Sequence, residues 1–201
     1  GAPMVEQIDG CVVRRFPVVG RGAYTWAPSL ALYLRRHHAE YDIVHAHQYH
    51  NPCASVAAFA TDRPLVLTPH FHGTGHTIPA RILHHPYRSV GHALFRRADA
   101  IVAVSRSERD RLERAFPDLA LDVFTIPGGV DAPEIRSHER YPVERPVVLV
   151  ASRLERYKQV DAVLRAAALL PEFDLVVCGD GSERAALEEL ARSLGISDRA
   201  S

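Results

Sequence analysis

The sequence predicts an α/β protein with two parallel, doubly wound sheets. Short apolar segments rich in Val, Ile and Leu alternate with helical patterns along nearly the whole chain, which is typical of strands joined by helical crossovers. The strand segments carry few charges, which predicts that parallel sheets bury them. The alternation is interrupted once, at the turn-rich Pro127–Pro133 and the polar stretch that follows it to Arg145. We therefore expect a first domain over 1–127, a linker over 128–145 and a second domain over 146–201, with both sheets incomplete.

The first domain is expected to open with β structure and then to alternate. Cys11–Val19 is rich in β-formers but contains Pro17, which favours an edge strand or a short hairpin. Ser105 and Glu108 have the spacing of a capping box and predict the start of a helix. The expected helices are Pro28–His38, Pro52–Ala60, Pro86–Arg97 and 106–116, the expected strands are Tyr41–Ala46, Pro64–Thr68, Ala100–Val104 and Val123–Ile126, and Pro69–His76 is expected to be irregular.

The second domain is expected to hold two strands and two helices. Val147–Ala151 begins with four apolar β-formers and predicts a buried strand. Apolar residues then recur at helical spacing, which predicts a helix over 158–170 and another over 182–194. Between these helices, Phe173–Cys178 predicts the second strand.

The charges and cysteines limit the classes of partner and compartment. Lys and Arg number 24 and Asp and Glu number 24, so the formal charge is zero, and no block of sequence is basic. We therefore expect no nucleic-acid partner. The three cysteines lie far apart, and Cys178 falls inside a strand pattern. This predicts a free core thiol in a reducing compartment, so the expected location is cytoplasmic.

Two cations lie where the first strand of the second domain gives way to a helix. Arg153 and Lys158 come after Ala151-Ser152, in the turn at the carboxyl end of the strand. Ligands of open α/β sheets bind at this edge, and the start of a helix favours anions there. Cations alone would oppose the helix dipole, so the pair predicts a bound phosphate or diphosphate. The alternative is a solvated helix start.

The next strand is followed by Gly179-Asp180-Gly181. Glycines at a strand-to-helix turn allow a ligand to approach the backbone, and the helix start adds donors. The alternative is an ordinary tight turn. The motif is not a dinucleotide fingerprint, because Arg184 stands where the third glycine would be.

Several of the twelve histidines fall near two strand ends, which raises the question of a metal site. His45 and His47 share one face of an extended strand, and so do His70 and His72. No spacing matches a zinc module, so we expect no metal. A histidine that serves as a polar group at the ligand-binding edge is the better interpretation, and His70 is our candidate.

Taken together, these segments resemble the retaining glycosyltransferases of family 4, which have the GT-B fold of two Rossmann-like domains. The resemblance runs through nearly the whole chain. Its segments are Asp42–His47, Thr68–His70, Ala98–Ser105, Ile126–Asp131, Ser152–Leu154 with Lys158, Gly179–Gly181 and Leu194–Arg199.

The resemblance implies that Arg153 and Lys158 hold the diphosphate of a nucleotide-sugar donor and act in catalysis by stabilising the nucleoside diphosphate as it leaves. It places His70 beside the sugar as a catalytic group from the acceptor-side domain, and Gly179 and Gly181 near the nucleoside. The implied reaction transfers a sugar with retention of configuration, without a cofactor or a catalytic metal. The acceptor is an unidentified sugar, lipid or small molecule, and peripheral contact with a membrane stays open.

The chain also departs from the family pattern. The first βαβ unit is not found before Cys11, and the glutamate pair E-x7-E is not found after the closing segment. We therefore expect a fragment that does not turn over by itself. Gln159 stands where Gly is common after the Lys, and Gly128 stands in place of the usual Asn. The alternatives are a non-catalytic nucleotide-binding fragment and another GT-B-like nucleotide-sugar enzyme, such as an epimerase with an acid/base carboxylate pair.

Overall fold

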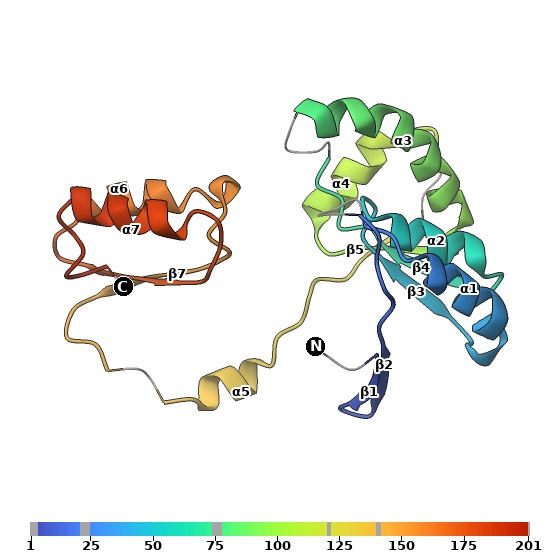
Figure 1. The fold of residues 1–201 in the computed structure, drawn as a ribbon, viewed down its shortest axis with the longest axis horizontal. Helices are drawn as coiled ribbons and strands as arrows, with labels where there is room; N and C mark the ends of the chain where they lie inside the picture. Colours follow the sequence, from blue (N-terminus) through green and yellow to red (C-terminus); the bar gives the residue numbers. More distant parts are fainter. Residues whose placement is uncertain (1–3, 21–24, 74–77, 120–121, 140–141, 201) are drawn as a thin grey trace. The chain divides into compact units, whose positions relative to one another are not determined.

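The computed structural model describes residues 4–20, 25–73, 78–119, 122–139 and 142–200, with only the backbone described for 78–86. The chain divides into two compact units, Gly1–Val130 and Asp131–Ser201, whose elements are labelled in Figure 1. Each unit has its own parallel sheet and its own hydrophobic core. The predicted fold class, α/β with parallel sheets on both sides of a break, is confirmed.

The first unit opens with a hairpin that begins earlier than predicted. Strand β1 (Val5–Ile8) pairs antiparallel with β2 (Cys11–Arg14), so the prediction of Cys11–Val19 missed the first strand. The turn consists of Asp9 and Gly10, with φ of 49° and 80°. A two-residue hairpin turn of this kind needs positive φ at both positions, and Asp-Gly between β-formers is a strong sequence signal for it.

Four parallel strands form the sheet of the first unit, in the order in which they occur along the chain. They are β3 (Val44–His47), β4 (Leu65–Thr68), β5 (Ala100–Ala103) and β6 (Val123–Thr125). Helices α2 (Pro52–Ala60), α3 (Ile78–Arg97) and α4 (Arg106–Ala115) connect them, and α1 (Pro28–His37) and the 3-10 turn η2 (His38–Glu40) come before β3. Right-handed crossovers in one direction place the three connecting helices on one face. The described strands show no reversal of order.

Among the helices and parallel strands of this unit, two begin more than one residue away from the predicted position. Strand β3 begins at Val44 rather than Tyr41, and it extends to His47. Helix α3 begins at Ile78, so Pro86 lies inside the helix and not at its start. Proline is usually a signal for the first helical position because it disfavours the helix interior, and here that signal was misleading.

The strand register separates the two faces of this sheet. Leu65, Leu67 and Ile101 are at most 2% exposed and belong to the core. The intervening residues His45 and Phe124 belong to the other face and are exposed. This alternation follows from the two-residue period of a strand, and it leaves one face of the sheet open in the described residues.

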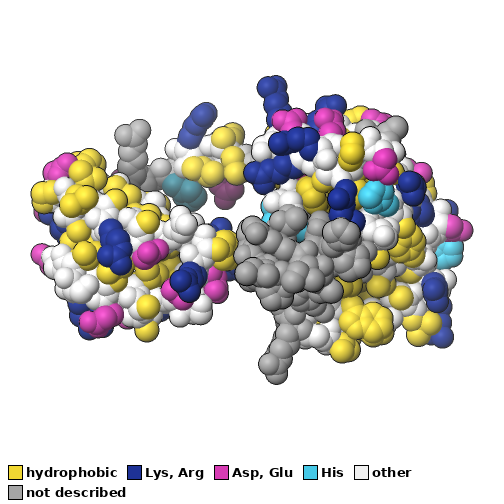
Figure 2. Space-filling view, turned by 90° about the horizontal axis from the view of Figure 1, so that it is seen from above, with side chains coloured by type: hydrophobic (Ala, Val, Ile, Leu, Met, Phe, Trp, Pro, Cys, Tyr) yellow, Lys and Arg dark blue, Asp and Glu magenta, His cyan; other side chains and the backbone are white. Residues whose placement is uncertain are grey.

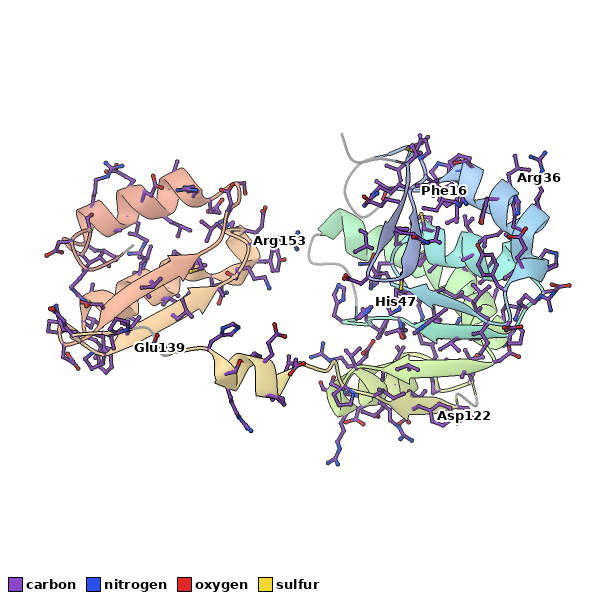
Figure 3. The ribbon with its side chains drawn as sticks, turned by 90° about the horizontal axis from the view of Figure 1, so that it is seen from below. Phe16, Arg36, His47, Asp122, Glu139 and Arg153 are labelled. Carbon is purple, nitrogen blue, oxygen red and sulfur yellow. The ribbon has the colours of Figure 1, made fainter. Side chains whose placement is uncertain are left out.

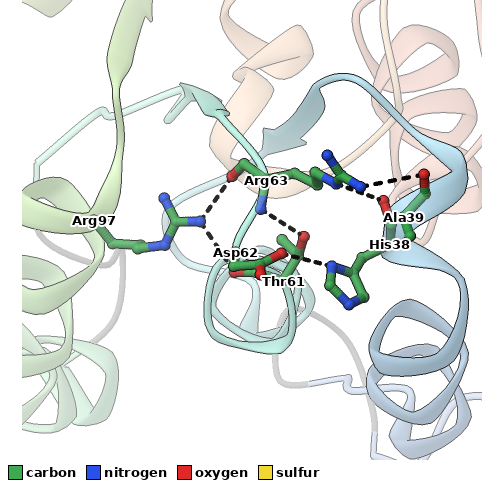
Figure 4. A network of polar contacts seen from close by, with 6 residues as sticks. All are labelled: His38, Ala39, Thr61, Asp62, Arg63 and Arg97. Atoms are coloured by element: carbon green, nitrogen blue, oxygen red, sulfur yellow. Dashed lines mark hydrogen bonds and ion pairs between the residues drawn. The ribbon is translucent and has the colours of Figure 1, made fainter.

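A polar network fastens the segment before β4 to two helix ends (Figure 4). The Arg63 guanidinium donates to the carbonyl oxygens of His38 and Ala39, at 3.1 and 3.2 Å. Arg97, at the end of α3, donates to the carbonyl oxygens of Thr61 and Arg63, at 3.0 and 2.8 Å. These bonds satisfy backbone carbonyl groups beside the amino edge of the sheet.

The second unit contains helix α5 (Ala132–Ser137), strand β7 (Val147–Ala151), the 3-10 turn η3 (Arg156–Lys158), helix α6 (Val160–Ala168), strand β8 (Asp174–Cys178) and helix α7 (Arg184–Ser193). Strands β7 and β8 pair in parallel, from Val147↔Asp174 to Ala151↔Cys178. Helix α5 lies within the stretch that was expected to be the linker. Its start is marked by the Asp131 side chain, which accepts a hydrogen bond from the Glu134 amide at 2.9 Å.

Two burial predictions for this unit are wrong. Val147, Val148 and Leu149 are 39, 37 and 63% exposed, although the apolar run predicted a buried strand. Cys178 is exposed, although it was predicted as a core thiol; its thiol is free, as expected. Helices α6 and α7 pack on the face that carries Leu175, Val150 and Val177, and the opposite face is open. Figure 2 looks onto the α6 and α7 side of this unit and shows apolar side chains at the surface there.

Candidate functional site

The predicted cation turn forms a compact loop at the carboxyl end of β7. Leu154 is 5% exposed and anchors the loop, while Arg153 and Lys158 are exposed on either side of it. The Arg153 side chain, labelled in Figure 3, projects from the surface of the unit. Hence the chain buries the residue that directly follows Arg153 and presents both cations to solvent.

Tyr157 lies between the two cations. The Arg153 guanidinium is 2.6 Å from the Tyr157 hydroxyl, to which it donates, and the Lys158 ammonium is 5.2 Å from the centre of the ring. Within the described part of the chain, neither cation has an Asp or Glu partner within 4.0 Å. The ring therefore brings two positive charges together without neutralising them, which suits an added anion.

Gln159, the residue after Lys158, has φ of 54° and is the N-cap of α6. This left-handed conformation is uncommon for residues other than glycine. Its side chain makes no capping hydrogen bond. The first turn of α6 therefore offers backbone amides beside the two cations, as an anion site at a helix start requires.

Gly179 and Gly181 are explained by their contact with the cation turn. A Cβ at Gly179 would lie 1.9 Å from the Ser152 carbonyl oxygen, and a Cβ at Gly181 would lie 2.4 Å from the Leu154 carbonyl oxygen. The Leu154 amide donates to the Asp180 carbonyl oxygen at 2.9 Å. The glycines thus let the two strand-end loops pack backbone against backbone and fix the loop that carries Arg153.

In the first unit, three histidines gather where β3 and β4 end. His47 Nδ1 and His70 Nε2 are 3.2 Å apart, and His45 Nε2 is 2.8 Å from the hydroxyl of the buried Thr68. The rings of His45 and His47 have their centres 4.3 Å apart. Burial, together with the charges of His45 and His70, lowers the pKa of His47. The neutral form of His47 is therefore favoured in the folded protein.

The backbone at these strand ends is strained at two adjacent positions. His70 has φ of 47° and Gln48, at the end of the neighbouring strand, has φ of 74°. Backbone amides hold the pair of loops together, because Gln48 N donates to Thr68 O at 2.9 Å and Tyr49 N to Pro69 O at 2.7 Å. Left-handed residues other than glycine concentrate at functional sites. Sequence reasoning singled out His70 but missed Gln48, whose identity gives no signal of its conformation.

The predicted capping box at the start of α4 is half correct. The Ser105 hydroxyl caps the helix by accepting from the Glu108 amide at 3.1 Å. The Glu108 side chain does not return to Ser105, as a capping box requires. Its two oxygens accept from the amides of Phe71, at 2.5 Å, and Val104, at 2.8 Å. Glu108 therefore connects the start of α4 to the loop that carries His70.

Other features of the described residues bear on what the molecule can bind. These residues include no group of three or more His, Cys, Asp or Glu placed to hold a metal ion. Of the helices described, none is long and apolar enough to cross a membrane. A cavity of about 370 Å³ at the amino ends of β5 and β6 is lined by Asp99, Asp118 and Asp122. Figure 3 labels Asp122 and His47 at opposite ends of this sheet. This cavity, which Arg96 also lines, is thus remote from the histidines.

The structure assembles the predicted residues as two groups. Arg153, Lys158, Gly179 and Gly181 lie together at the carboxyl edge of the second unit's sheet. His70 lies with His47 at the carboxyl edge of the first unit's sheet. Two α/β units, each with a parallel sheet and with polar groups at the carboxyl ends of its strands, are typical of a class of protein that binds ligands at this edge.

Comparison with known families identifies that class. The sequence pattern of Glycosyltransferase Family 4 matches residues 1–134, and that of Glycosyl transferases group 1 matches residues 131–201. The chain belongs to the family 4 glycosyltransferases.

Relatives in sequence agree with this assignment. A D-inositol 3-phosphate glycosyltransferase of Xylanimonas cellulosilytica is 32% identical over 183 residues, a match that covers 79% of this chain and 44% of the relative. Another, D-inositol 3-phosphate glycosyltransferase 1 of Catenulispora acidiphila, is 29% identical, with 98% of this chain and 55% of the relative covered. The chain thus spans about half the length of these relatives.

Solved structures give the same fold at low sequence identity. Sucrose-phosphate synthase of Thermosynechococcus elongatus has a TM-score of 0.73 and 19% identity, with 100% of this chain and 56% of that chain covered. HepE of Anabaena, solved in complex with UDP and glucose, has a TM-score of 0.63 and 23% identity, with 87% of this chain and 50% of that chain covered. These likenesses establish the GT-B fold.

Proposed function

We propose that this chain is the central part of a retaining glycosyltransferase that uses a nucleotide-diphosphate sugar as donor. The observation that carries the proposal is the pair of exposed cations, Arg153 and Lys158, which flank Tyr157 at the start of α6 without an acidic partner in the described residues. A diphosphate carries the charge and the acceptor oxygens that such a pair requires.

Each cation has its own part in the proposed site. The planar guanidinium of Arg153 binds phosphate oxygens through a forked pair of hydrogen bonds, and the ammonium of Lys158 acts as a point charge. The amides at the start of α6 add donors that are fixed before the ligand arrives. As the bond from sugar to phosphate breaks, negative charge grows on the departing diphosphate, and these groups stabilise it.

Gly179 and Gly181 contribute in two ways to the proposed donor site. Their lack of a side chain lets the second loop hold the Ser152–Leu154 backbone, and thus Arg153, in place. In the proposed complex the same backbone runs near the nucleoside. The complex of HepE with UDP and glucose supports a uridine nucleotide as the first donor to test.

We assign His70 to the sugar side of the reaction, as the catalytic group from the acceptor-side unit. Its exposed ring, at the end of β4, can donate or accept a hydrogen bond, and one of its nitrogens is already in contact with His47.

The reaction proposed here retains the configuration of the sugar and needs no metal ion. The names of the relatives make D-inositol 3-phosphate the first acceptor to test. The free thiols of Cys11, Cys53 and Cys178 support the proposed cytoplasmic location.

A transfer assay tests this proposal. Uridine, guanosine and adenosine diphosphate sugars would be incubated with D-inositol 3-phosphate and with the protein extended to the length of its relatives. Proton NMR of the product then reports the anomeric configuration. We expect transfer with retention from the extended protein, and donor binding without turnover from the 201-residue chain. Inversion would contradict the mechanism, turnover by the short chain would contradict the fragment proposal, and donor binding without transfer by the extended protein would favour a non-catalytic nucleotide-binding protein.

A further inference from the structure

We propose that Glu108 is a positioning residue for His70, and that it acts through the backbone amide of Phe71. The inference rests on the catalytic role proposed above for His70. Neither helix formation nor packing requires a charged side chain at the buried position of Glu108.

Glu108 is unusual because it is a charged side chain that is only 5% exposed. Burial of a charge is costly unless hydrogen bonds replace the lost water. Both carboxylate oxygens have such a bond, one from the Phe71 amide at 2.5 Å and one from the Val104 amide at 2.8 Å. Since Phe71 and Glu108 are 37 residues apart in sequence, the bond joins two distant segments, which Arg111 also connects by donating to the His72 carbonyl oxygen at 3.5 Å.

The turn that carries His70 is anchored on both sides. Pro69 is less than 2% exposed, and its carbonyl oxygen accepts from the Tyr49 amide. Phe71 is 4% exposed, and its ring packs edge-on against Tyr49, with the ring centres 5.3 Å apart. Between these buried neighbours His70 is exposed and left-handed. A residue keeps this conformation only where its surroundings impose it, and the Glu108 bond to the very next amide is one such constraint.

The position of the backbone sets the position of the imidazole. His70 Nε2 is 3.2 Å from His47 Nδ1, near the upper limit of a good hydrogen bond. A small rotation of the turn would break this contact and turn the ring away from His47. Glu108 therefore determines where the other ring nitrogen of His70, Nδ1, points, without contact with any substrate.

The test uses three substitutions in α4 of the 201-residue chain. Glu108→Gln keeps the size of the side chain, but its NH2 group faces one of the two backbone amides and cannot accept from it. Leu112→Ala removes a fully buried side chain one turn further along the helix and serves as a control for lost stability. Glu113→Gln removes an exposed charge that pairs with Arg109 and serves as a control for charge.

The readouts are the ring resonances of His70 and the hydrogen exchange of the Phe71 amide, both followed by NMR. We expect Glu108→Gln to shift the His70 resonances and to speed exchange at Phe71 by about tenfold or more, which is the change for a lost charged hydrogen bond. Leu112→Ala is expected to lower the melting temperature without shifting the His70 ring, and Glu113→Gln to change neither.

The inference is overturned if Glu108→Gln leaves the His70 resonances and the Phe71 exchange rate at their wild-type values, or if Leu112→Ala shifts the ring as much. Should the Gln variant not fold, Glu108→Asp takes its place, because the shorter carboxylate cannot reach both amides. The proposed function is tested separately by His70→Ala in the protein extended to the length of its relatives, because the 201-residue chain is not expected to turn over. If that change left sugar transfer intact, the proposed catalytic role of His70 would fail. The His70 resonances of the Glu108 variants would still report whether Glu108 positions the turn.

Discussion

Three left-handed residues other than glycine mark the proposed ligand edges, one beside the cations and two at the histidines. Gln48 and His70 end neighbouring strands, and Gln159 opens α6 directly after Lys158. Their conformations cost free energy that no regular element demands. The sequence pattern locates such edges, since strand ends can be predicted, but it does not reveal that Gln48 is strained, because glutamine is not a residue typical of this conformation.

The strain at Gln159 predicts a stabilising substitution. Gln159→Gly is expected to raise the free energy of unfolding by up to about 1 kcal/mol, because glycine removes a left-handed penalty of about 1–2 kcal/mol at some cost in unfolded-chain entropy. Gln159→Ala keeps the penalty and is the control. Urea unfolding measures both, and a glycine variant less stable than the alanine variant would contradict the prediction.

The pKa of His47 predicts a pH dependence of stability. Burial, His45 and His70 lower this pKa below its usual 6.5, so between the lowered value and 6.5 the unfolded chain binds more protons than the folded protein. Stability is therefore expected to fall as the pH drops through this window. Compared with the wild type, His47→Gln should show a smaller loss between pH 7 and pH 5 in urea unfolding. Equal losses in the two proteins would refute the assignment.

At the scale of elements, the alternation of strands and helices predicted most of the fold. The four parallel strands of the first unit and both strands of the second lie within or beside the predicted ranges. The errors have physical causes. Strand β1 was missed because the Asp9-Gly10 turn signal was not used, and α3 was shortened because Pro86 was taken as a start. The strand-to-helix turn that carries Arg153 and Lys158 was predictable from spacing, whereas the place of Tyr157 between the cations depends on the path of the loop.

The contact between the two strand-end loops of the second unit predicts a strong effect at Gly181. In Gly181→Ala the new Cβ would lie 2.4 Å from the Leu154 carbonyl oxygen and 2.9 Å from the Leu154 amide nitrogen, so the backbone beside Arg153 must move. We expect a loss of about 1–3 kcal/mol in the free energy of unfolding and weaker binding of UDP. Gly129→Ala is the matched control, because no atom lies within 4 Å of its new Cβ. Equal behaviour of the two variants would show that the loops do not depend on this contact.

At the scale of the whole molecule, each of the two parallel sheets has helices on one face only in the described residues. The open face of the second unit carries Val147 and Leu149, whereas Leu175 faces α6 and α7. The open face explains why the prediction of burial failed for β7. A run of apolar residues is typical of a strand in a parallel sheet, but it does not tell how many faces of that sheet are covered by helices in the described residues.

This asymmetry predicts different costs for the same substitution on neighbouring strands. Leu149→Ala is expected to change the free energy of unfolding by no more than about 0.5 kcal/mol, since Leu149 is 63% exposed. Leu175→Ala is expected to cost about 2–5 kcal/mol, since Leu175 is 1% exposed. Urea unfolding followed by circular dichroism compares them, and a large cost at Leu149 would mean that the face is covered in solution.

The measurement that tests the central claim most directly is calorimetric titration of the 201-residue chain with UDP. If both cations bind the diphosphate, Arg153→Ala and Lys158→Ala should each weaken UDP binding about 10- to 150-fold. This is the equivalent of about 1.5–3 kcal/mol for a charged hydrogen bond. Arg156→Ala, which removes an exposed cation from the same turn, should leave the affinity unchanged. Failure of the wild-type chain to bind UDP, or an equal loss in all three variants, would contradict the assignment of Arg153 and Lys158 to the donor diphosphate.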